Sequence, residues 1–313
     1  MKALIIGAAG FVGGYLADHL RGDLGWSVCV TKMPQETCEI EEAEIYDLDI
    51  LEKDAVKELF EKTAPDYIFH LAAQSSVAVS WKRPELTVDV NVKGCVNVLE
   101  AAKELQKKPR ILLIGSSEEY GPSLSEENPV NENQPLRPGN IYAATKACQG
   151  MLGSIYAKAY QMDVMMVRAF NHIGPKQAPM FVVSDFCKQV AEIEKGLKGP
   201  VMYVGNLSAK RDFTDVRDIV RAYSVLIQKG CAGETYNVGS GHAIAIQELL
   251  DEILKLSMKE IRVETDPQKL RPVDVPVVEA DVTKLVSETG WKRKYELKDT
   301  LKDILEYWRA ELQ

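Results

Sequence analysis

Two side chains that can exchange a proton, Tyr142 and Lys146, lie four residues apart in the segment Ile-Tyr-Ala-Ala-Thr-Lys. Residues at this spacing share one face of a helix. Because an ammonium group favours the phenolate form of a neighbouring phenol, we expect Lys146 to lower the pKa of Tyr142 below its usual value of about 10. Tyr142 would then donate or accept a proton near neutral pH. The same spacing is common on ordinary exposed helices, so this prediction depends on the motifs around it.

A polar segment that contains Ser116, Ser117 and Glu118 follows an apolar run typical of a buried strand. In open α/β sheets, ligands bind at the edge where the parallel strands end. Ser116 can hydrogen-bond a substrate oxygen there, and Glu118 can act as a general base. Serine and glutamate also serve as cap and turn residues, which is the structural alternative.

Glycine recurs at every third position from Gly7 through Gly10 to Gly13, directly after the first apolar run. Glycines between a strand and a helix permit a tight turn, a close approach to a pyrophosphate and close helix–strand packing. The amino end of the following helix then faces the phosphates. The spacing is GxxGxxG rather than GxGxxG, but its position after a strand favours a dinucleotide-binding loop over a surface turn.

The residues after the second predicted strand bear on which dinucleotide binds. NAD-specific proteins place an acidic residue there, which holds both ribose hydroxyls. Here the strand ends in Thr31-Lys32-Met33 with no carboxylate. Lys32 lies about twenty residues past the glycine loop, where a 2′-phosphate would sit. We therefore predict that NADPH is used at least as well as NADH, with a merely solvated Lys32 as the alternative.

Apolar strands alternate with helical patterns through the first half of the chain. The predicted buried strands are Lys2–Ile6, Ser27–Thr31, Asp66–Ala72, Arg110–Ile114 and Val164–Phe170. A predicted helix carries a stripe of small and apolar side chains, namely Val88, Val92, Cys95, Val96, Leu99 and Ala102. This alternation predicts an α/β fold with a doubly wound parallel Rossmann sheet and helices on both faces.

The pattern loosens after Phe170. We interpret residues 1–170 as an NAD(P)-binding domain and residues 171–313 as a smaller α/β substrate domain, partly interleaved with the first. Residues 171–180 form a predicted loop, and two prolines exclude a regular helix over 270–281. The predicted elements of this half are helices over 182–197, 215–229, 246–256 and 297–308, and a short strand over 235–238.

Composition limits the classes of function. The chain has 313 residues, of which 46% are hydrophobic and 27% charged, as in ordinary folded enzymes. A net charge of -8 argues against a nucleic-acid partner, so anionic ligands must meet local arginines and helix amino ends. Apolar runs are too short to span a membrane, and the amino terminus lacks a signal-peptide layout. Six scattered cysteines and four histidines predict reduced thiols, no metal site and a cytoplasmic protein.

Together these motifs, with a length just above 300 residues, resemble the extended short-chain dehydrogenase/reductase family. The resemblance extends over essentially the whole chain and includes His70-Leu-Ala-Ala, Asn91-Val-Lys-Gly and the segment from Arg168 to Pro175. Within the family, residues 116–121, 170–175, 209–218 and 270–276 resemble GDP-6-deoxy-4-keto-D-mannose reductases and their sister enzymes, the GDP-mannose 4,6-dehydratases.

Two departures favour the reductases. The dehydratases usually carry Gly-Gln-Asp-Gly in the glycine loop, where this chain has Gly10-Phe11-Val12-Gly13. They also carry an arginine pair after the second strand and extra length, both of which this chain lacks. Glu118, in contrast, occupies the position of the dehydratase general base.

The resemblance implies a complete site. The catalytic residues would be Ser116, Glu118, Tyr142 and Lys146. The residues at the cofactor would be Gly7, Gly10, Phe11, Val12, Gly13, Thr31, Lys32, Asp49, Ile50, Leu71, Ala72, Ala73, Tyr142, Lys146, Phe170 and His172. Those at the sugar nucleotide would be Ser116, Ser117, Glu118, Tyr142, Asn171, Val182, Arg211 and Arg271. On physical grounds alone, the two arginines suit phosphate and ribose oxygens, or surface ion pairs.

The reaction implied is reduction of the C4 ketone of GDP-4-keto-6-deoxy-D-mannose to GDP-D-rhamnose, with NADP(H) or alternatively NAD(H). A GDP-mannose 4,6-dehydratase, or another nucleotide-sugar epimerase or dehydratase, is the neighbouring alternative. A non-catalytic dinucleotide sensor on the same fold is a different class. A sensor would not need Ser116, Tyr142 and Lys146 together, which disfavours it. The resemblance also implies a homodimer through the helices near residues 88–103 and 147–160, and no membrane partner is expected.

Overall fold

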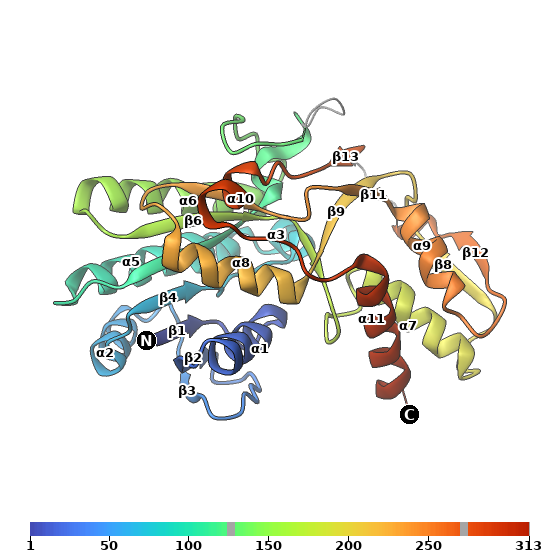
Figure 1. The fold of residues 1–313 in the computed structure, drawn as a ribbon, viewed down its shortest axis with the longest axis horizontal. Helices are drawn as coiled ribbons and strands as arrows, with labels where there is room; N and C mark the ends of the chain where they lie inside the picture. The colour runs from blue at the N-terminus through green and yellow to red at the C-terminus, as the bar shows by residue number, and fades with distance from the viewer. Residues whose placement is uncertain (124–128, 270–274, 313) are drawn as a thin grey trace.

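A seven-stranded parallel sheet forms the centre of the computed structural model, which describes residues 1–123, 129–269 and 275–312 (Figure 1). The strand order is β10-β6-β5-β4-β1-β2-β3. The strands are β1 (Lys2–Ile6), β2 (Ser27–Lys32), β3 (Glu44–Asp47), β4 (Tyr67–His70), β5 (Arg110–Ser116), β6 (Val164–Ala169) and β10 (Thr235–Val238). The order runs one way from β1 and the other way from β4, which confirms the predicted doubly wound sheet.

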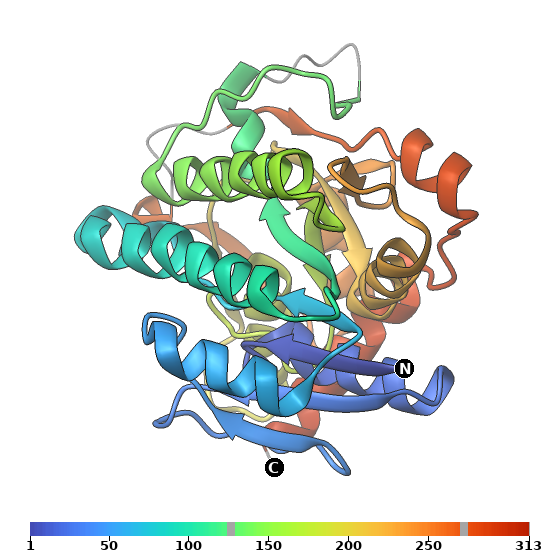
Figure 2. The ribbon, with the colours of Figure 1, turned by 90° about the vertical axis from the view of Figure 1, so that its left-hand side faces the viewer.

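Helices cover both faces of this sheet, and Figure 2 separates the two layers, with α5 and α6 on one side and α8 on the other. The first layer holds α2 (Lys53–Thr63), α5 (Gly94–Glu104) and α6 (Ile141–Tyr160). The second layer holds α1 (Phe11–Asp18) and α8 (Val216–Lys229). Each layer buries its own apolar cluster against the sheet, as expected for strands buried on both faces.

Several short helical segments connect these elements. They are η1 (His19–Asp23), α3 (Val77–Lys82), α4 (Pro84–Val88), η2 (Asp89–Lys93) and η3 (Ser117–Ser123). The predicted apolar stripe from Val88 is correct only in part, because η2 is a π-type turn. A π turn inserts an extra residue and rotates the helix face. Cys95, Leu99 and Ala102 are therefore buried, whereas Val88 is 45% exposed.

A second, smaller α/β unit is built from the later part of the chain and lies to the right in Figure 1. Its strands are β7 (Asn171–Ile173), β8 (Val201–Val204), β9 (Lys210–Asp215), β11 (Ala243–Ala245), β12 (Arg262–Thr265) and β13 (Val277–Val278). Its helices are α7 (Val182–Glu194), α9 (Ile246–Lys255), η4 (Pro267–Lys269) and α11 (Leu297–Glu311). Apolar faces of α7, α9 and α11 share a third core.

The two units are interleaved along the chain. After β9 the chain returns to the large sheet, where α8 covers one face and β10 pairs with β6 at the edge. Helix α10 (Thr283–Thr289) then packs against α8 and β10 before α11 re-enters the small unit. The predicted strand over 235–238 is therefore confirmed, but it belongs to the large sheet and not to the small unit.

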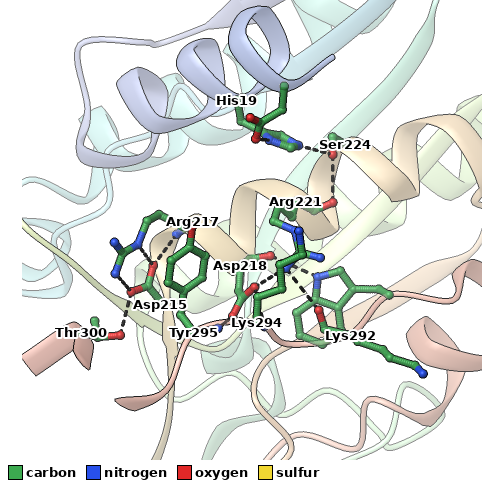
Figure 3. A network of polar contacts seen from close by, with 12 residues as sticks. His19, Asp215, Arg217, Asp218, Arg221, Ser224, Lys292, Lys294, Tyr295 and Thr300 are labelled. Carbon is green, nitrogen blue, oxygen red and sulfur yellow. Dashed lines mark hydrogen bonds and ion pairs between the residues drawn. The ribbon is translucent and has the colours of Figure 1, made fainter. Parts of the chain in front are cut away.

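A polar cluster at the start of α8 joins this helix to the carboxyl-terminal segment (Figure 3). The Asp218 carboxylate is fully buried and accepts hydrogen bonds from the backbone amides of Lys294 and Tyr295, at 2.9–3.0 Å. Arg217 pairs with Asp215, whose second oxygen accepts a hydrogen bond from the Thr300 hydroxyl at 2.7 Å. Much of the sequence motif at 209–218 thus serves the packing of the carboxyl-terminal segment.

Several short elements were not predicted, and β3 and β7 are two examples. Strand β3 was not predicted, because most of its side chains are exposed at the sheet edge and show no apolar period. The predicted loop over 171–180 is wrong at its start, where residues 171–173 pair with β9 as β7. No helix in the described ranges is long and apolar enough to cross a membrane.

Candidate functional site

The glycine loop joins β1 to α1 at the carboxyl edge of the sheet. Gly7 has a φ of +85°, and a Cβ on it would lie 2.6 Å from the Cα of Ala72. A Cβ on Gly13 would overlap the backbone of Ala8. Both glycines are therefore required by the packing of the protein itself. Gly10 differs, because it is exposed at the N-cap of α1 and the nearest atom to its Cβ would be 3.7 Å away.

This open space at Gly10 fits the pyrophosphate of a dinucleotide. The first amides of a helix, here those of Phe11 and Val12, have no acceptor within the helix. Together with the helix dipole they favour an anion at this end. The close approach that the sequence assigned to all three glycines is thus available at Gly10, while Gly7 and Gly13 shape the loop.

The neighbouring strand ends hold the glycine loop in place. The Thr31 hydroxyl accepts a hydrogen bond from the Gly7 amide at 3.1 Å. The amides of Leu71 and Ala72 both donate to the Ile6 carbonyl, at 3.0 and 2.8 Å. Ala73 follows as a half-buried residue. Thr31 is buried, so its side chain supports the loop rather than facing outward.

Lys32 ends β2, as the sequence prediction requires, but its ammonium group already has an anionic partner. Lys32 Nζ lies 2.5 Å from the Asp47 carboxylate at the end of β3. The Lys32 side chain is 18% exposed and that of Asp47 is 59% exposed. The sequence analysis missed Asp47, because the strand that carries it was not predicted. A 2′-phosphate at Lys32 would therefore compete with, or share, this carboxylate.

Asp49 and Ile50 follow β3, where the resemblance places the adenine. The Asp49 carboxylate accepts a hydrogen bond from the Leu51 amide at 2.9 Å. Ile50 is buried, and its carbonyl accepts a hydrogen bond from the Asn97 side chain at 2.9 Å. Both residues are held by local hydrogen bonds, and their contact with adenine stays a prediction.

Ser116 and Tyr142 meet at the carboxyl end of β5. Tyr142 lies in the first turn of α6, and the Ser116 side chain lies near enough to its hydroxyl to oppose the rise of the Tyr142 pKa. Ser116 Oγ also accepts a hydrogen bond from the Glu118 amide at 3.2 Å. Two of the predicted catalytic side chains are thus brought together where ligands bind in open α/β sheets.

The predicted lowering of the Tyr142 pKa by Lys146 is wrong. Burial raises the pKa of Tyr142 to about 12, and the nearby Ser116 side chain only partly opposes this effect. The Lys146 ammonium group instead donates to the Ile114 carbonyl at 2.6 Å and to Gln149 Oε1 at 3.2 Å. Burial lowers the pKa of Lys146 to about 8. Lys146 is thus directed at the end of β5, and Tyr142 is a protonated phenol near neutral pH.

Glu118 is exposed on the η3 turn, next to the half-buried Ser117. Its carboxylate accepts a hydrogen bond from Asn140 Nδ2 at 3.0 Å. Asn140 is also the N-cap of α6, because its Oδ1 accepts a hydrogen bond from the Ala143 amide at 2.8 Å. One asparagine thus links Glu118 to the helix that carries Tyr142. The sequence analysis missed Asn140, although an asparagine just before a helical pattern is a recognisable cap signal.

His172 faces the glycine loop from β7. Its ring stacks on that of Phe11, with centroids 6.0 Å apart and planes 5° apart. The His172 Nδ1 lies 3.2 Å from the Phe170 carbonyl, and burial lowers the pKa of His172. Phe170 itself is buried. Two predicted cofactor residues distant in the sequence, Phe11 and His172, are therefore in contact.

Three of the predicted sugar-nucleotide residues, Asn171, Val182 and Arg211, lie on the small unit. Asn171 is exposed on β7, which pairs with β9, and Arg211 lies on β9. Arg211 Nη1 donates to the Val275 carbonyl at 2.7 Å. Val182 begins α7 and packs against the third core. Arg271 lies outside the described residues.

Glu119 is a further residue that the sequence analysis missed. It is 2% exposed, and its carboxylate accepts a hydrogen bond from the Ser116 amide at 2.8 Å. It also pairs with Arg168 on β6, at 3.1 Å. Two adjacent glutamates look alike in a sequence, and only the path of the η3 turn decides which one is buried. Within the described ranges, His, Cys, Asp and Glu side chains form no group of three or more that could hold a metal ion.

A Rossmann sheet, a glycine loop at a helix amino end and a Ser–Tyr–Lys group at the edge of β5 define a short-chain dehydrogenase/reductase of the extended kind. A family model described as GDP-mannose 4,6 dehydratase matches residues 4–304. The chain belongs to this family.

Among curated relatives, "GDP-6-deoxy-D-mannose reductase" of Pseudomonas aeruginosa is 30% identical over 100% of this chain and 98% of its own length. A "GDP-mannose 4,6-dehydratase" of Yersinia enterocolitica is 28% identical over 93% of this chain and 89% of its own length. The solved structure of RMD from Pseudomonas aeruginosa complexed with NADPH has a TM-score of 0.88 at 31% identity. The superposition covers 99% of this chain and 100% of the RMD chain. A UDP-glucose 4-epimerase from Thermotoga maritima has a TM-score of 0.89 at 27% identity, with 100% of each chain covered.

Proposed function

We propose that this protein reduces the C4 ketone of GDP-4-keto-6-deoxy-D-mannose to give GDP-D-rhamnose. The observation that carries this proposal is the position of Tyr142 in the first turn of α6, beside Ser116 at the end of β5. A ketone that becomes an alcohol needs one proton on its oxygen. A tyrosine with its usual pKa of about 10 already holds that proton near neutral pH. Burial raises the pKa of Tyr142 to about 12, which keeps the proton in place over a wider pH range. This protonation state suits a proton donor better than a base.

Tyr142, Ser116 and Lys146 have different roles in the proposed reduction. NADP(H), or NAD(H), supplies the hydride when it is bound. Tyr142 gives its proton to O4 of the sugar, and the Ser116 hydroxyl orients the same oxygen. Lys146 holds a positive charge at the end of β5, next to the Ile114 carbonyl. Charge on the oxygen in the transition state is stabilised best by groups fixed in advance, as these are.

The cofactor proposal rests on the glycine loop and on the relatives. The P. aeruginosa RMD structure contains NADPH, and the UDP-glucose 4-epimerase structure from Thermus thermophilus contains NAD. The loop at Gly10 and the stacked Phe11 and His172 suit either dinucleotide. Lys32 favours the phosphorylated form, subject to its ion pair with Asp47.

A GDP-mannose 4,6-dehydratase is the second candidate, and Glu118 is the observation that favours it. Dehydration needs a base for the C5 proton and an acid for the C6 hydroxyl. The Glu118 carboxylate is exposed at the same strand end as Ser116, so it can reach a sugar there. Ketone reduction needs no such base, so in a reductase Glu118 only binds or orients the sugar.

The deciding experiment compares Tyr142→Phe with Glu118→Gln. Purified protein is given GDP-4-keto-6-deoxy-D-mannose and NADPH, and the product is identified by NMR. For a reductase, Tyr142→Phe lowers kcat by the 10²–10⁴-fold typical of a lost acid–base group, or by more. Glu118→Gln keeps the shape of the side chain and lowers kcat by less than roughly tenfold, well short of that range.

The same preparations are also given GDP-mannose, with no added cofactor and with added NADP⁺. A reductase leaves GDP-mannose unchanged and depends on added NADPH at every turnover. If the wild type converts GDP-mannose to the 4-keto sugar and Glu118→Gln abolishes this conversion, the protein is a dehydratase.

A further inference from the structure

We propose that Glu119 is a positioning residue of the catalytic centre, whose buried carboxylate fixes the backbone of Ser116 and supplies the negative charge that faces Lys146 and Tyr142. This role rests on the proposed reaction, in which Ser116, Tyr142 and Lys146 act on the sugar ketone. It differs from the role of Glu118, which is exposed and can touch the substrate directly.

The Glu119 carboxylate contacts the backbone of Ser116. One carboxylate oxygen accepts a hydrogen bond from the Ser116 amide at 2.8 Å, and the other lies 3.1 Å from Arg168 Nε. Arg168 is fixed in turn, because it donates to the Tyr120 hydroxyl at 2.9 Å and to the Glu132 carbonyl at 3.0 Å. The backbone of the residue that orients the ketone is thus tied to a buried, hydrogen-bonded ion pair.

Gly115 makes this arrangement possible. A Cβ at this position would overlap Glu119 Oε1 and the Val167 carbonyl oxygen. The absence of a side chain therefore lets the carboxylate sit under the last residue of β5. A cavity of about 10 Å³, room for about one water, is lined by Glu119, Gln149 and Arg168. Gln149 accepts a hydrogen bond from Lys146 at 3.2 Å, so the same amide side chain lines this cavity and contacts the ammonium group.

The charge of Glu119 affects the pKa values of both Lys146 and Tyr142. Glu119 raises the pKa of Lys146 against the dominant effect of burial, and it also raises the pKa of Tyr142. Burial raises the pKa of Glu119 itself, and the Arg168 guanidinium opposes that effect. Further titratable groups that act on these side chains are Glu118 and Tyr120 on η3, Cys95 on α5, His70 on β4 and Tyr223 on α8. Loss of the Glu119 charge therefore moves both Lys146 and Tyr142 toward deprotonation at lower pH.

The test measures the titration of Lys146 in Glu119→Gln. Protein carrying 13C-labelled lysine is titrated by NMR, and the Lys146 signal is assigned by its loss in Lys146→Met. The pKa of Lys146 is expected to fall. With the 4-keto sugar and NADPH, the alkaline limb of kcat/KM is expected to move to lower pH by on the order of one unit. At neutral pH kcat falls by roughly tenfold or more, as for a misplaced catalytic group, with a smaller change in KM.

A second variant covers the case in which a lone buried Arg168 prevents folding. Glu119→Gln combined with Arg168→Gln replaces the ion pair by two amides that can bond each other, and the carboxylate that faces Lys146 is still missing. The matched control is Glu194→Gln, since Glu194 is 4% exposed in its side chain and pairs with Arg309 at 2.7 Å in the small unit. This control is expected to lose stability while the Lys146 titration and the pH profile stay unchanged.

Each outcome decides the matter. If Lys146 titrates in both Glu119 variants as it does in the wild type, Glu119 has no such role. If Glu194→Gln shifts the pH profile equally, the effect is one of general destabilisation and the proposal fails. The Lys146 titration needs no turnover, so an enzyme inactive on the 4-keto sugar would overturn the proposed function and still test Glu119.

Discussion

Lys32 and Asp47 meet at the ends of β2 and β3, and their balance bears on the choice of dinucleotide. The ion pair is short, at 2.5 Å, but the Asp47 side chain is 59% exposed. Exposed pairs contribute little, typically 0–1 kcal/mol. A phosphate group that brings two negative charges can therefore take over the Lys32 ammonium group.

Lys32→Glu is expected to reverse the use of cofactor. Loss of a charge-assisted contact costs about 1.5–3 kcal/mol, so the ratio of kcat/KM for NADPH to that for NADH should fall at least about tenfold. Asp47→Asn should raise the same ratio, because it frees Lys32 for the phosphate. Steady-state kinetics with both cofactors measures the ratio.

Lys255→Glu is the matched control for this ratio. Lys255 pairs with Glu252 at 2.6 Å on α9 in the small unit. An unchanged ratio in Lys32→Glu would mean that Lys32 is only solvated and that another group reads the ribose.

Sequence motifs predicted the positions of the site residues better than their protonation. The positions of Ser116, Tyr142 and Lys146 followed from spacing, because strand ends and helix turns have fixed geometry. The direction of the Tyr142 pKa did not, because the length and path of the Lys146 side chain let it bond the Ile114 carbonyl instead. Burial, which comes from the whole fold, then decides the sign.

At the scale of elements, α6 carries the proposed catalytic pair Tyr142 and Lys146, and Asn140 is its N-cap. This residue holds both the first turn of the helix and the Glu118 carboxylate. The helix start is therefore mechanically linked to the η3 turn.

Asn140→Ala and Asn140→Asp should separate these two contacts. Alanine removes the cap and is expected to cost about 1 kcal/mol of stability in urea unfolding. Aspartate keeps the capping oxygen and should retain most of the stability, but it places a second carboxylate against Glu118. Turnover of the 4-keto sugar should then fall in Asn140→Asp without a matching loss of stability. Equal stability in wild type and Asn140→Ala would show that the cap contributes nothing.

The elements also show where periodicity is informative. Buried strands and long helices were found because an apolar face repeats along them. Strand β3 was not predicted because its position at the edge of the sheet leaves Glu44, Ile45 and Asp47 exposed. Strand β7 escaped because three residues are too few to show a period, and its pairing with β9 comes from residues about forty positions away.

At the scale of the whole molecule, the start of α8 joins both units to the carboxyl-terminal segment. The Asp218 carboxylate is fully buried and pairs with Arg221 at 2.5 Å. The same carboxylate accepts hydrogen bonds from the backbone amides of Lys294 and Tyr295. The sequence analysis classed this motif with GDP-sugar enzymes but could not separate its ligand-facing part from its structural part.

Asp218→Ala is expected to destabilise the protein by about 3–5 kcal/mol, because it leaves Arg221 and two amides without their acceptor. Urea unfolding of the variant measures this loss. Asp251→Ala is the control, since Asp251 is exposed on α9 and accepts a hydrogen bond from Gln247. A loss no greater than that of the control would mean that water or a neighbouring group replaces the carboxylate.

The return of the chain to the large sheet sets a condition on synthesis. When β6 leaves the ribosome, its free edge and the apolar face later covered by α8 are still open, because residues 216–238 have not been made. At usual elongation rates of about 5–20 residues per second, the nascent protein stays in this state for several seconds. An open strand edge beside an apolar surface is prone to pair with another chain. The interleaved order thus creates a period in which β6 has an unpaired edge and an uncovered apolar face.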